Sequence, residues 1–221
     1  MFGRSSAPSL LSKKTFRAAE RDLERNKEKR RVYEEELAKV PDDKRVYVDE
    51  AGTNLGMSRA YSRSPEGQRA FSVRPASNRG NISLVAAVRL KKESVMYPFD
   101  GAVDGERFLT FLDEHLLKTL SPDDVVILDN VRFHHIAEVQ ERLKTVGAKA
   151  LFLPPYSPEL NPIEEGFSLV KSVFKSAEAR TICAYIDALD AAKKSLTPEK
   201  IEAFFKHANS FLGKSTSTQS V

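Results

Sequence analysis

Three carboxylates stand where apolar segments end or begin, and they are the residues best placed to do chemistry. Asp49 and Asp129 each follow a strand-like apolar run, and Glu164 lies near the start of a helix-like segment. An ionised carboxylate beside a buried strand is costly unless a cation neutralises it. Carboxylate oxygens with little histidine or cysteine nearby favour hard cations such as Mg²⁺. The three acids therefore predict a metal site if the fold brings them together.

Each of these acids also has a structural interpretation. Aspartate is common where strands end and turns begin, without any catalytic role. Asn161 with Glu164 three residues later matches a helix capping box. Glu50 and Glu165 are possible substitutes for their neighbours, although Glu50 should face the opposite side of its strand from Asp49. The residues alone leave these alternatives open.

The segments that position the acids predict a mixed α/β sheet of about five strands flanked by helices. Branched and aromatic residues predict strands at 45–49, 82–89, 94–99, 125–128 and 148–153. Helical spacing predicts helices at 104–119, at about 136–146, from Asn161 with Pro162 in its first position, and after Thr197. A right-handed crossover makes the last two strands parallel neighbours. Sites in such sheets form at the carboxyl ends of the strands.

The remaining segments indicate how the chain is divided. Residues 16–40 predict a charged helix broken near Asn26 and Arg30, where the apolar stripe is interrupted. Residues 51–80 predict a loop with a short hairpin around 70–73. We expect an arm and linker helix at 1–43, a catalytic domain at 44–182 and a helical extension at 183–221.

The helix that begins near Asn161 has a polar face beside its apolar stripe. Glu164 is followed on that face by Lys171 and Lys175. Lysines below a metal-binding acid suit a DNA phosphate backbone, but an ordinary solvent-facing strip has the same pattern. His134, shortly after Asp129, either touches a phosphate or metal ligand or is a polar residue of a cap region.

Composition agrees with a nucleic-acid partner without proving one. The 221 residues carry a formal net charge of +4 and a pI near 9.1, which suits DNA but also fits other basic proteins. The single cysteine, Cys183, excludes an internal disulfide and favours a reducing cytoplasm. No segment approaches the roughly 20 apolar residues of a membrane span.

At these residues the sequence resembles the mariner-type superfamily of DDE transposases, particularly bacterial insertion-sequence members. Val48–Gly52 (VDEAG) looks like the first-Asp block, where Thr is more usual than Ala51. Leu128–His134 (LDNVRFH) is similar to the second block, and Leu153–Glu164 (LPPYSPELNPIE) to the third nearly throughout. Residues 130–163, 34 in number, separate the second and third acids, which is the family's spacing.

The resemblance implies an RNase H-like fold with Asp49, Asp129 and Glu164 as catalytic and metal-binding residues. The metal would be Mg²⁺ or Mn²⁺, with two ions. The implied reaction is hydrolytic nicking at element ends, then attack of the freed 3′-hydroxyl on target DNA, typically at TA, by a homodimer in the bacterial nucleoid. The residues expected to contact DNA are Asn130, Arg132, His134, Lys171 and Lys175.

The sequence departs from the family at its N-terminus. Such transposases usually carry a helix-turn-helix region before the catalytic core, and the residues before Asp49 show no such pattern. We therefore expect a catalytic half, which is a separate reading frame, a truncated copy or an excised fragment, and a separate DNA-binding half is one candidate partner. Two other functions stay open. One is another RNase H-like nuclease, such as a ribonuclease H or a junction resolvase. The other is a truncated transposase that binds DNA or partner subunits without transposing.

Overall fold

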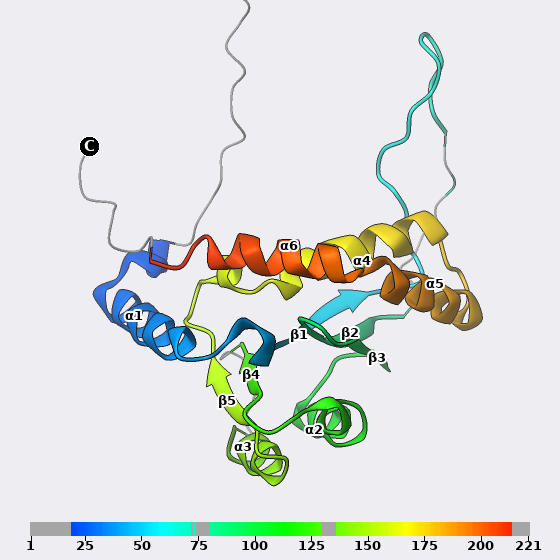
Figure 1. The fold of residues 1–221 in the computed structure, drawn as a ribbon. Helices are drawn as coiled ribbons and strands as arrows, with labels where there is room; N and C mark the ends of the chain where they lie inside the picture. The colour runs from blue at the N-terminus through cyan, green and yellow to red at the C-terminus, as the bar shows by residue number, and fades with distance from the viewer. Residues whose placement is uncertain (1–18, 72, 74–79, 130–135, 214–221) are drawn as a thin grey trace, which may run out of the picture.

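A single five-stranded sheet organises the chain (Figure 1). The computed structural model describes residues 19–71, 73, 80–129 and 136–213. The strands are β1 (Arg45–Thr53), β2 (Ile82–Arg89), β3 (Val95–Asp100), β4 (Val125–Leu128) and β5 (Lys149–Phe152), in the spatial order β3-β2-β1-β4-β5. β1, β2 and β3 pair antiparallel, whereas β1, β4 and β5 pair parallel. The predicted mixed sheet of five strands is confirmed.

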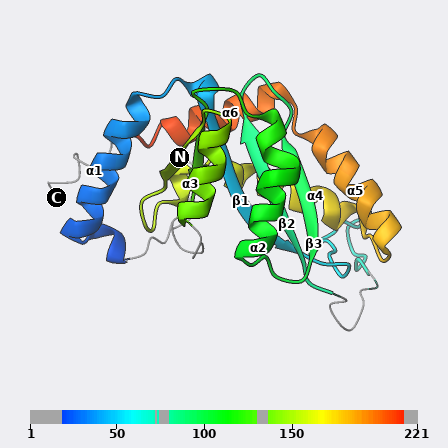
Figure 2. The same cartoon turned by 90° about the horizontal axis from the view of Figure 1, so that it is seen from below.

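Helices cover both faces of this sheet. One face carries α4 (Ile163–Ala177), α5 (Ile182–Ser195) and α6 (Pro198–Asn209), and the other carries α2 (Gly105–Phe111) and α3 (Ile136–Thr145) (Figures 1 and 2). α1 (Glu24–Ala38) lies at the end of the molecule near β5. Short 3₁₀ turns occupy Ala19–Asp22, Asp42–Lys44, Leu117–Thr119 and Pro158–Leu160, and a π turn occupies Leu112–Leu116. Buried apolar clusters fill the space on each side of the sheet.

β1 is longer than its sequence predicts, and this changes the position of the first acid. The strand was expected to end at Asp49, but it continues to Thr53 because β2 pairs with it from Val46↔Arg89 to Thr53↔Ile82. The parallel pairing between β1 and β4 is shorter and includes only Arg45–Val48 of β1. Asp49 is therefore in the middle of β1, yet it is the first residue beyond the parallel pairing.

Two other predicted elements differ from the structure. The helix predicted at 104–119 is α2 followed by the π and 3₁₀ turns, and the Asp104 side chain caps α2 by accepting from the Arg107 N–H (2.9 Å). The hairpin predicted around 70–73 lies partly outside the described residues, and residues 70, 71 and 73 are not in a strand. Within the described residues of this loop (54–71, 73, 80 and 81) there is no strand.

The break predicted in the first helix near Asn26 and Arg30 is wrong. α1 runs without interruption, and Asn26, Arg30, Tyr33 and Leu37 are its buried residues. Their positions are 4, 3 and 4 apart, which is the spacing of one helix face. A sequence pattern that counts only apolar residues misses such a face, because two of its members are polar.

Arg30 is buried because the third-acid block supplies its partners. Its guanidinium donates to Ser157 Oγ (2.7 Å) and to Glu159 Oε1 (2.6 Å), and its Nε lies 3.3 Å from Glu34 Oε1. Only 4% of the Arg30 side chain is exposed. A buried charge is tolerated only when it is paired in this way. The contact attaches α1 to the turn that precedes α4.

α1 and the C-terminal helices share a core with the sheet. Tyr33 and Leu37 of α1 belong to the same buried cluster as Phe167 of α4 and Phe205 of α6. The divisions at 43/44 and 182/183 stay predictions. Across the described residues, no helix is both long and apolar enough to cross a membrane.

Replacing Arg30 by Met should lower the free energy of unfolding by about 3 kcal/mol, because Glu159 and Glu34 would keep partly buried charges without their cation. Arg31→Met is the matched control, since Arg31 pairs with Glu28 and Glu35 on the exposed side of the same helix. It should cost less than about 1 kcal/mol. Urea unfolding monitored by circular dichroism measures both variants. Equal losses would show that the buried ion pairs do not hold α1 in place.

Candidate active site

Asp49 is held on β1 by a hydrogen bond to each of its carboxylate oxygens. Oδ1 accepts from the Glu50 backbone N–H (2.7 Å), and Oδ2 accepts from Asn161 Nδ2 (3.1 Å). Tyr47, two residues earlier, is buried in the cluster that contains the α4 side chains. Since side chains alternate along a strand, Asp49 faces α4 as well. This orientation directs the first acid toward the start of that helix.

Asp129 follows β4 directly and lies beside Asp49 in the sheet. Val48 pairs with Leu128 in the parallel ladder, so the next residue on each strand is an aspartate. Ile127 is buried in the cluster below α4, and alternation therefore places Asp129 on the same face as Asp49. The fold brings together two acids that are far apart in the sequence.

Glu164 is the second residue of α4 and is exposed. A carboxylate in the first turn of a helix is stabilised by the positive end of the helix dipole. The predicted capping box is not formed, because the Asn161 N–H already donates to the Pro158 carbonyl oxygen (3.0 Å). Asn161 instead accepts from the Ile163 N–H through its side chain (3.3 Å). The structural interpretation of Glu164 as the partner of Asn161 is therefore wrong.

One small cavity joins the three predicted acids. Its volume is about 160 Å³, and Asp49, Asp129 and Glu164 all line it. Its other lining residues come from β1, β2 and the region of α2: Val48, Glu50, Val85, Val103 and Phe108. Four carboxylates thus line the pocket, the three predicted acids and Glu50, and its other four lining residues are apolar.

Glu50 and Glu165, the neighbours that could replace Asp49 and Glu164, differ in their position relative to the pocket. Glu165 lies 2.7 Å from His207 Nδ1 of α6, which draws its carboxylate away from the pocket. Glu50 lines the pocket, but it pairs with Val85, a member of the buried cluster on the α2 side of the sheet. It therefore approaches from the face opposite Asp49, as its place in the strand predicts. The face that α4 covers presents Asp49 rather than Glu50.

The donor chemistry of the pocket fits a hard divalent cation. Its acids offer carboxylate oxygens, the ligands that Mg²⁺ and Mn²⁺ prefer. In the described part of the chain, no three Asp, Glu, His or Cys side chains are close enough to form a ready-made metal cage. Mg²⁺ does not require one, because it keeps several waters and usually binds one or two carboxylates together with substrate phosphates. The residues present suit that mode of binding.

The predicted DNA contacts are placed only in part. Asn130, Arg132 and His134 lie outside the described residues. Lys175 is exposed and Lys171 is partly exposed on α4, on the side next to its buried stripe. Neither lysine lines the cavity of the acids. The helix positions both along one face, as the sequence predicts.

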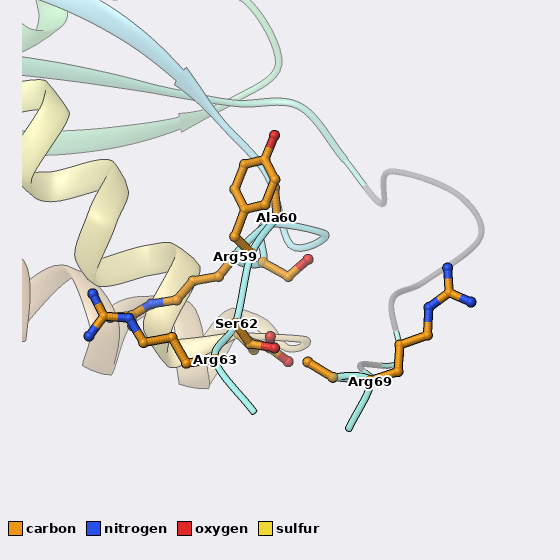
Figure 3. A pocket seen from close by; sticks show the side chains of 9 residues that line it. Arg59, Ala60, Ser62, Arg63 and Arg69 are labelled. Atoms are coloured by element: carbon orange, nitrogen blue, oxygen red, sulfur yellow. The ribbon is translucent and has the colours of Figure 1, made fainter. Parts of the chain in front are cut away.

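A larger and more open hollow, about 1120 Å³, lies on the loop between β1 and β2. Arg59, Arg63 and Arg69 line it, and the side chains of the first two extend to the same side, toward α4 (Figure 3). Arg59 donates to Ser176 Oγ at the end of α4 (2.6 Å from Nη2). Its lining contains one acid, Glu178, whereas the smaller cavity has four. The hollow is a basic surface and has no catalytic set.

Sequence reasoning missed one residue of the site. Asn161 was expected only to cap a helix, but its amide also holds Asp49. The signal was the amide itself, because Asn offers a donor as well as the acceptor that a cap needs. Nothing in the sequence identified the carboxylate that would receive that donor.

Comparisons with known proteins agree with this geometry. Residues 44–184 match the family model described as DDE superfamily endonuclease, and this range includes the three acids. No curated protein matches the chain significantly.

Several solved structures have a similar fold. A Mos1 transposase paired-end complex with left transposon end has a TM-score of 0.72 and 20% identity, covering 96% of this chain and 67% of that chain. A mariner Mos1 paired end complex with Mg has a TM-score of 0.66 and 19% identity, covering 95% and 68%. The Mos1 transposase catalytic domain with Raltegravir and Mn has a TM-score of 0.60 and 14% identity, covering 93% and 100%.

At these identities the similarity shows the fold, which is the RNase H-like fold of a transposase catalytic domain. The family match extends over well more than half of the chain and does not depend on those structures. The chain therefore belongs to the DDE superfamily endonucleases.

Proposed function

We propose that the chain cleaves DNA strands and transfers them to target DNA, with Asp49, Asp129 and Glu164 as its catalytic residues. The observation that supports this most is the single cavity that all three acids line. The family match and the fold shared with Mos1 transposase support the reaction class. The proposed cofactor is Mg²⁺ or Mn²⁺, held by these acids as two ions, and the proposed site of action is DNA in the bacterial nucleoid.

The residues of the chain position the reactants. Asp49 is fixed by hydrogen bonds on both oxygens, and β4 presents Asp129 at the same level of the sheet. Glu164 approaches from the first turn of α4. Divalent metal bound by these acids would activate a water or a DNA 3′-hydroxyl and neutralise the leaving oxygen. The protein itself then contributes alignment and charge, without a covalent intermediate.

DNA is the proposed partner, as transposon ends and as target. The net charge of +4, the exposed lysines of α4 and the arginines on the β1–β2 loop support a polyanionic ligand. Asn130, Arg132 and His134, next to the second acid in the sequence, complete the proposed contacts. A homodimer on DNA and a separate DNA-binding half are further parts of the proposal.

Asp129→Asn should reduce metal-dependent nicking of supercoiled plasmid by at least about 100-fold, because losing one metal-binding charge removes several kcal/mol of transition-state stabilisation. Asp187→Asn, on the exposed side of α5, is the matched control and should nick at the rate of the unmodified protein. Agarose gels of plasmid incubated with Mn²⁺ measure both.

Equal nicking by the two variants would contradict the three-acid assignment. Absence of nicking by the unmodified protein, despite DNA binding, would favour a truncated transposase that does not act alone. A preference for RNA–DNA hybrid over duplex DNA would favour another RNase H-like nuclease.

Changing Lys171 and Lys175 together to Gln should weaken DNA binding and make it less sensitive to salt. Each lost phosphate contact lowers the slope of log affinity against log salt by about 0.9, so the pair should lower it by nearly 2. Lys193 and Lys194, exposed at the end of α5, give a control of equal charge. Fluorescence anisotropy of a labelled duplex at several salt concentrations measures the slopes. If both double variants have the same slope, the α4 lysines form an ordinary solvent-facing strip.

On DNA that carries the ends bordering its own gene, the chain should have the mass of a dimer, because joining two ends requires two active sites. Multi-angle light scattering of the chain, alone and with this DNA, gives the mass directly. A mass of one chain in both samples would argue against the dimer. A dimer that forms only after a separate DNA-binding half is added would support the need for that half.

A further inference from the structure

Asn161 occupies a buried position between the first and third acids. Only 4% of it is exposed, and it follows the 3₁₀ turn Pro158–Leu160 immediately before the start of α4. Its own N–H is bonded within that turn, to the Pro158 carbonyl oxygen. Its carbonyl oxygen accepts from the Glu164 N–H of α4 (3.2 Å), and its side-chain amide is the part that reaches β1.

The amide makes two hydrogen bonds in different directions. Nδ2 donates to Asp49 Oδ2 (3.1 Å), and Oδ1 accepts from the Ile163 N–H (3.3 Å). These partners fix the assignment of the amide nitrogen and oxygen, because an ionised carboxylate only accepts and a backbone N–H only donates. One buried side chain thus spans β1 and the first residue of α4. The two bonded residues Asn161 and Asp49 are 112 positions apart in the chain.

The bond to Asn161 completes the orientation of Asp49. The Glu50 N–H holds one carboxylate oxygen and Asn161 holds the other, so rotation of the carboxylate is restricted from both sides. Each carboxylate oxygen has two lone-pair sites, so an oxygen that accepts one hydrogen bond can still bind a metal. Groups that hydrogen-bond to a ligating carboxylate orient it and tune its affinity for the metal.

We propose that Asn161 is a positioning residue of the metal site, which holds the Asp49 carboxylate in its binding orientation and aligns it with Glu164. The proposal rests on the proposed function, in which Asp49 and Glu164 bind metal. Asn161 does not touch the reacting atoms. It acts through Asp49 on one side and through the start of α4, which carries Glu164, on the other.

A purely structural role would involve only the bond to Ile163. Asn161→Ser separates the two roles. A serine hydroxyl is a good acceptor for a backbone N–H at a helix start. It is too short to replace the amide nitrogen that reaches Asp49. The variant should keep the start of α4 and lose the restraint on the first acid.

Asn209→Ala is the matched control for this change. Asn209 Nδ2 also donates to an aspartate, Asp42 (3.0 Å), and its Oδ1 accepts from Arg45 (3.2 Å). Neither partner lines the cavity of the acids. The control therefore removes a similar amide–carboxylate bond at a place that does not affect the metal.

The test is direct binding of Mn²⁺ to the full chain, measured by electron paramagnetic resonance of the free ion. Asn161→Ser should weaken Mn²⁺ binding by 10-fold to 100-fold, the range typical for groups that orient metal ligands. Asn209→Ala should bind as the unmodified protein does. Plasmid nicking by Asn161→Ser should recover to within a few-fold at saturating Mn²⁺. Asn161→Thr is a second variant in case Ser disturbs the fold, as judged by circular dichroism and thermal melting.

Each contrary result has a distinct meaning when Asp49→Asn is measured alongside. If Asp49→Asn abolishes Mn²⁺ binding while Asn161→Ser leaves it unchanged, the metal site stands and the positioning role is overturned. If Asp49→Asn itself leaves Mn²⁺ binding unchanged, the proposed metal site is overturned together with this inference. Equal weakening by Asn161→Ser and Asn209→Ala would also overturn the positioning role, because the loss would not depend on contact with Asp49.

Discussion

The parallel register between β1 and β4 is the constraint on which the site depends. Val48 pairs with Leu128, so Asp49 and Asp129 follow at the same level of the sheet. A slip of one residue would turn one strand's side chains to the opposite face. Burial on both faces opposes that slip, since Val48 belongs to one buried cluster and Tyr47 to the other. The apolar packing that stabilises the sheet therefore also aligns the two acids.

Much of this arrangement could be predicted from sequence because its signals are local. β2 and β4 have the bounds that their runs of apolar residues predict, and the stripe on α4 is buried as its helical spacing predicts. Crossover geometry correctly made β4 and β5 parallel neighbours. Three acids near strand ends and a helix start predicted one shared site, and one cavity contains all three. Their catalytic role stays a prediction.

The features that could not be predicted depend on partners distant in sequence. β1 continues to Thr53 because β2 pairs with it, and the residues of β1 do not by themselves predict that pairing. Arg30 appears to interrupt an apolar stripe, and only the Ser157 and Glu159 side chains make its burial possible. Asn161 is a residue type typical of helix caps, but the carboxylate that accepts a hydrogen bond from its amide nitrogen lies in the first strand.

The separation between Asp49 and Asn161 has a consequence for the synthesis of the protein. A chain emerging from the ribosome can pair β1 with β2 early, because the two strands are neighbours in sequence as well as in the sheet. The donor for Asp49 and the third acid arrive 112 or more positions later, on a segment that must still pack against the sheet. A nascent or prematurely terminated chain that ends before α4 thus carries the first acids without an assembled site. Under the proposed function, DNA cutting would begin only after α4 has packed against the sheet.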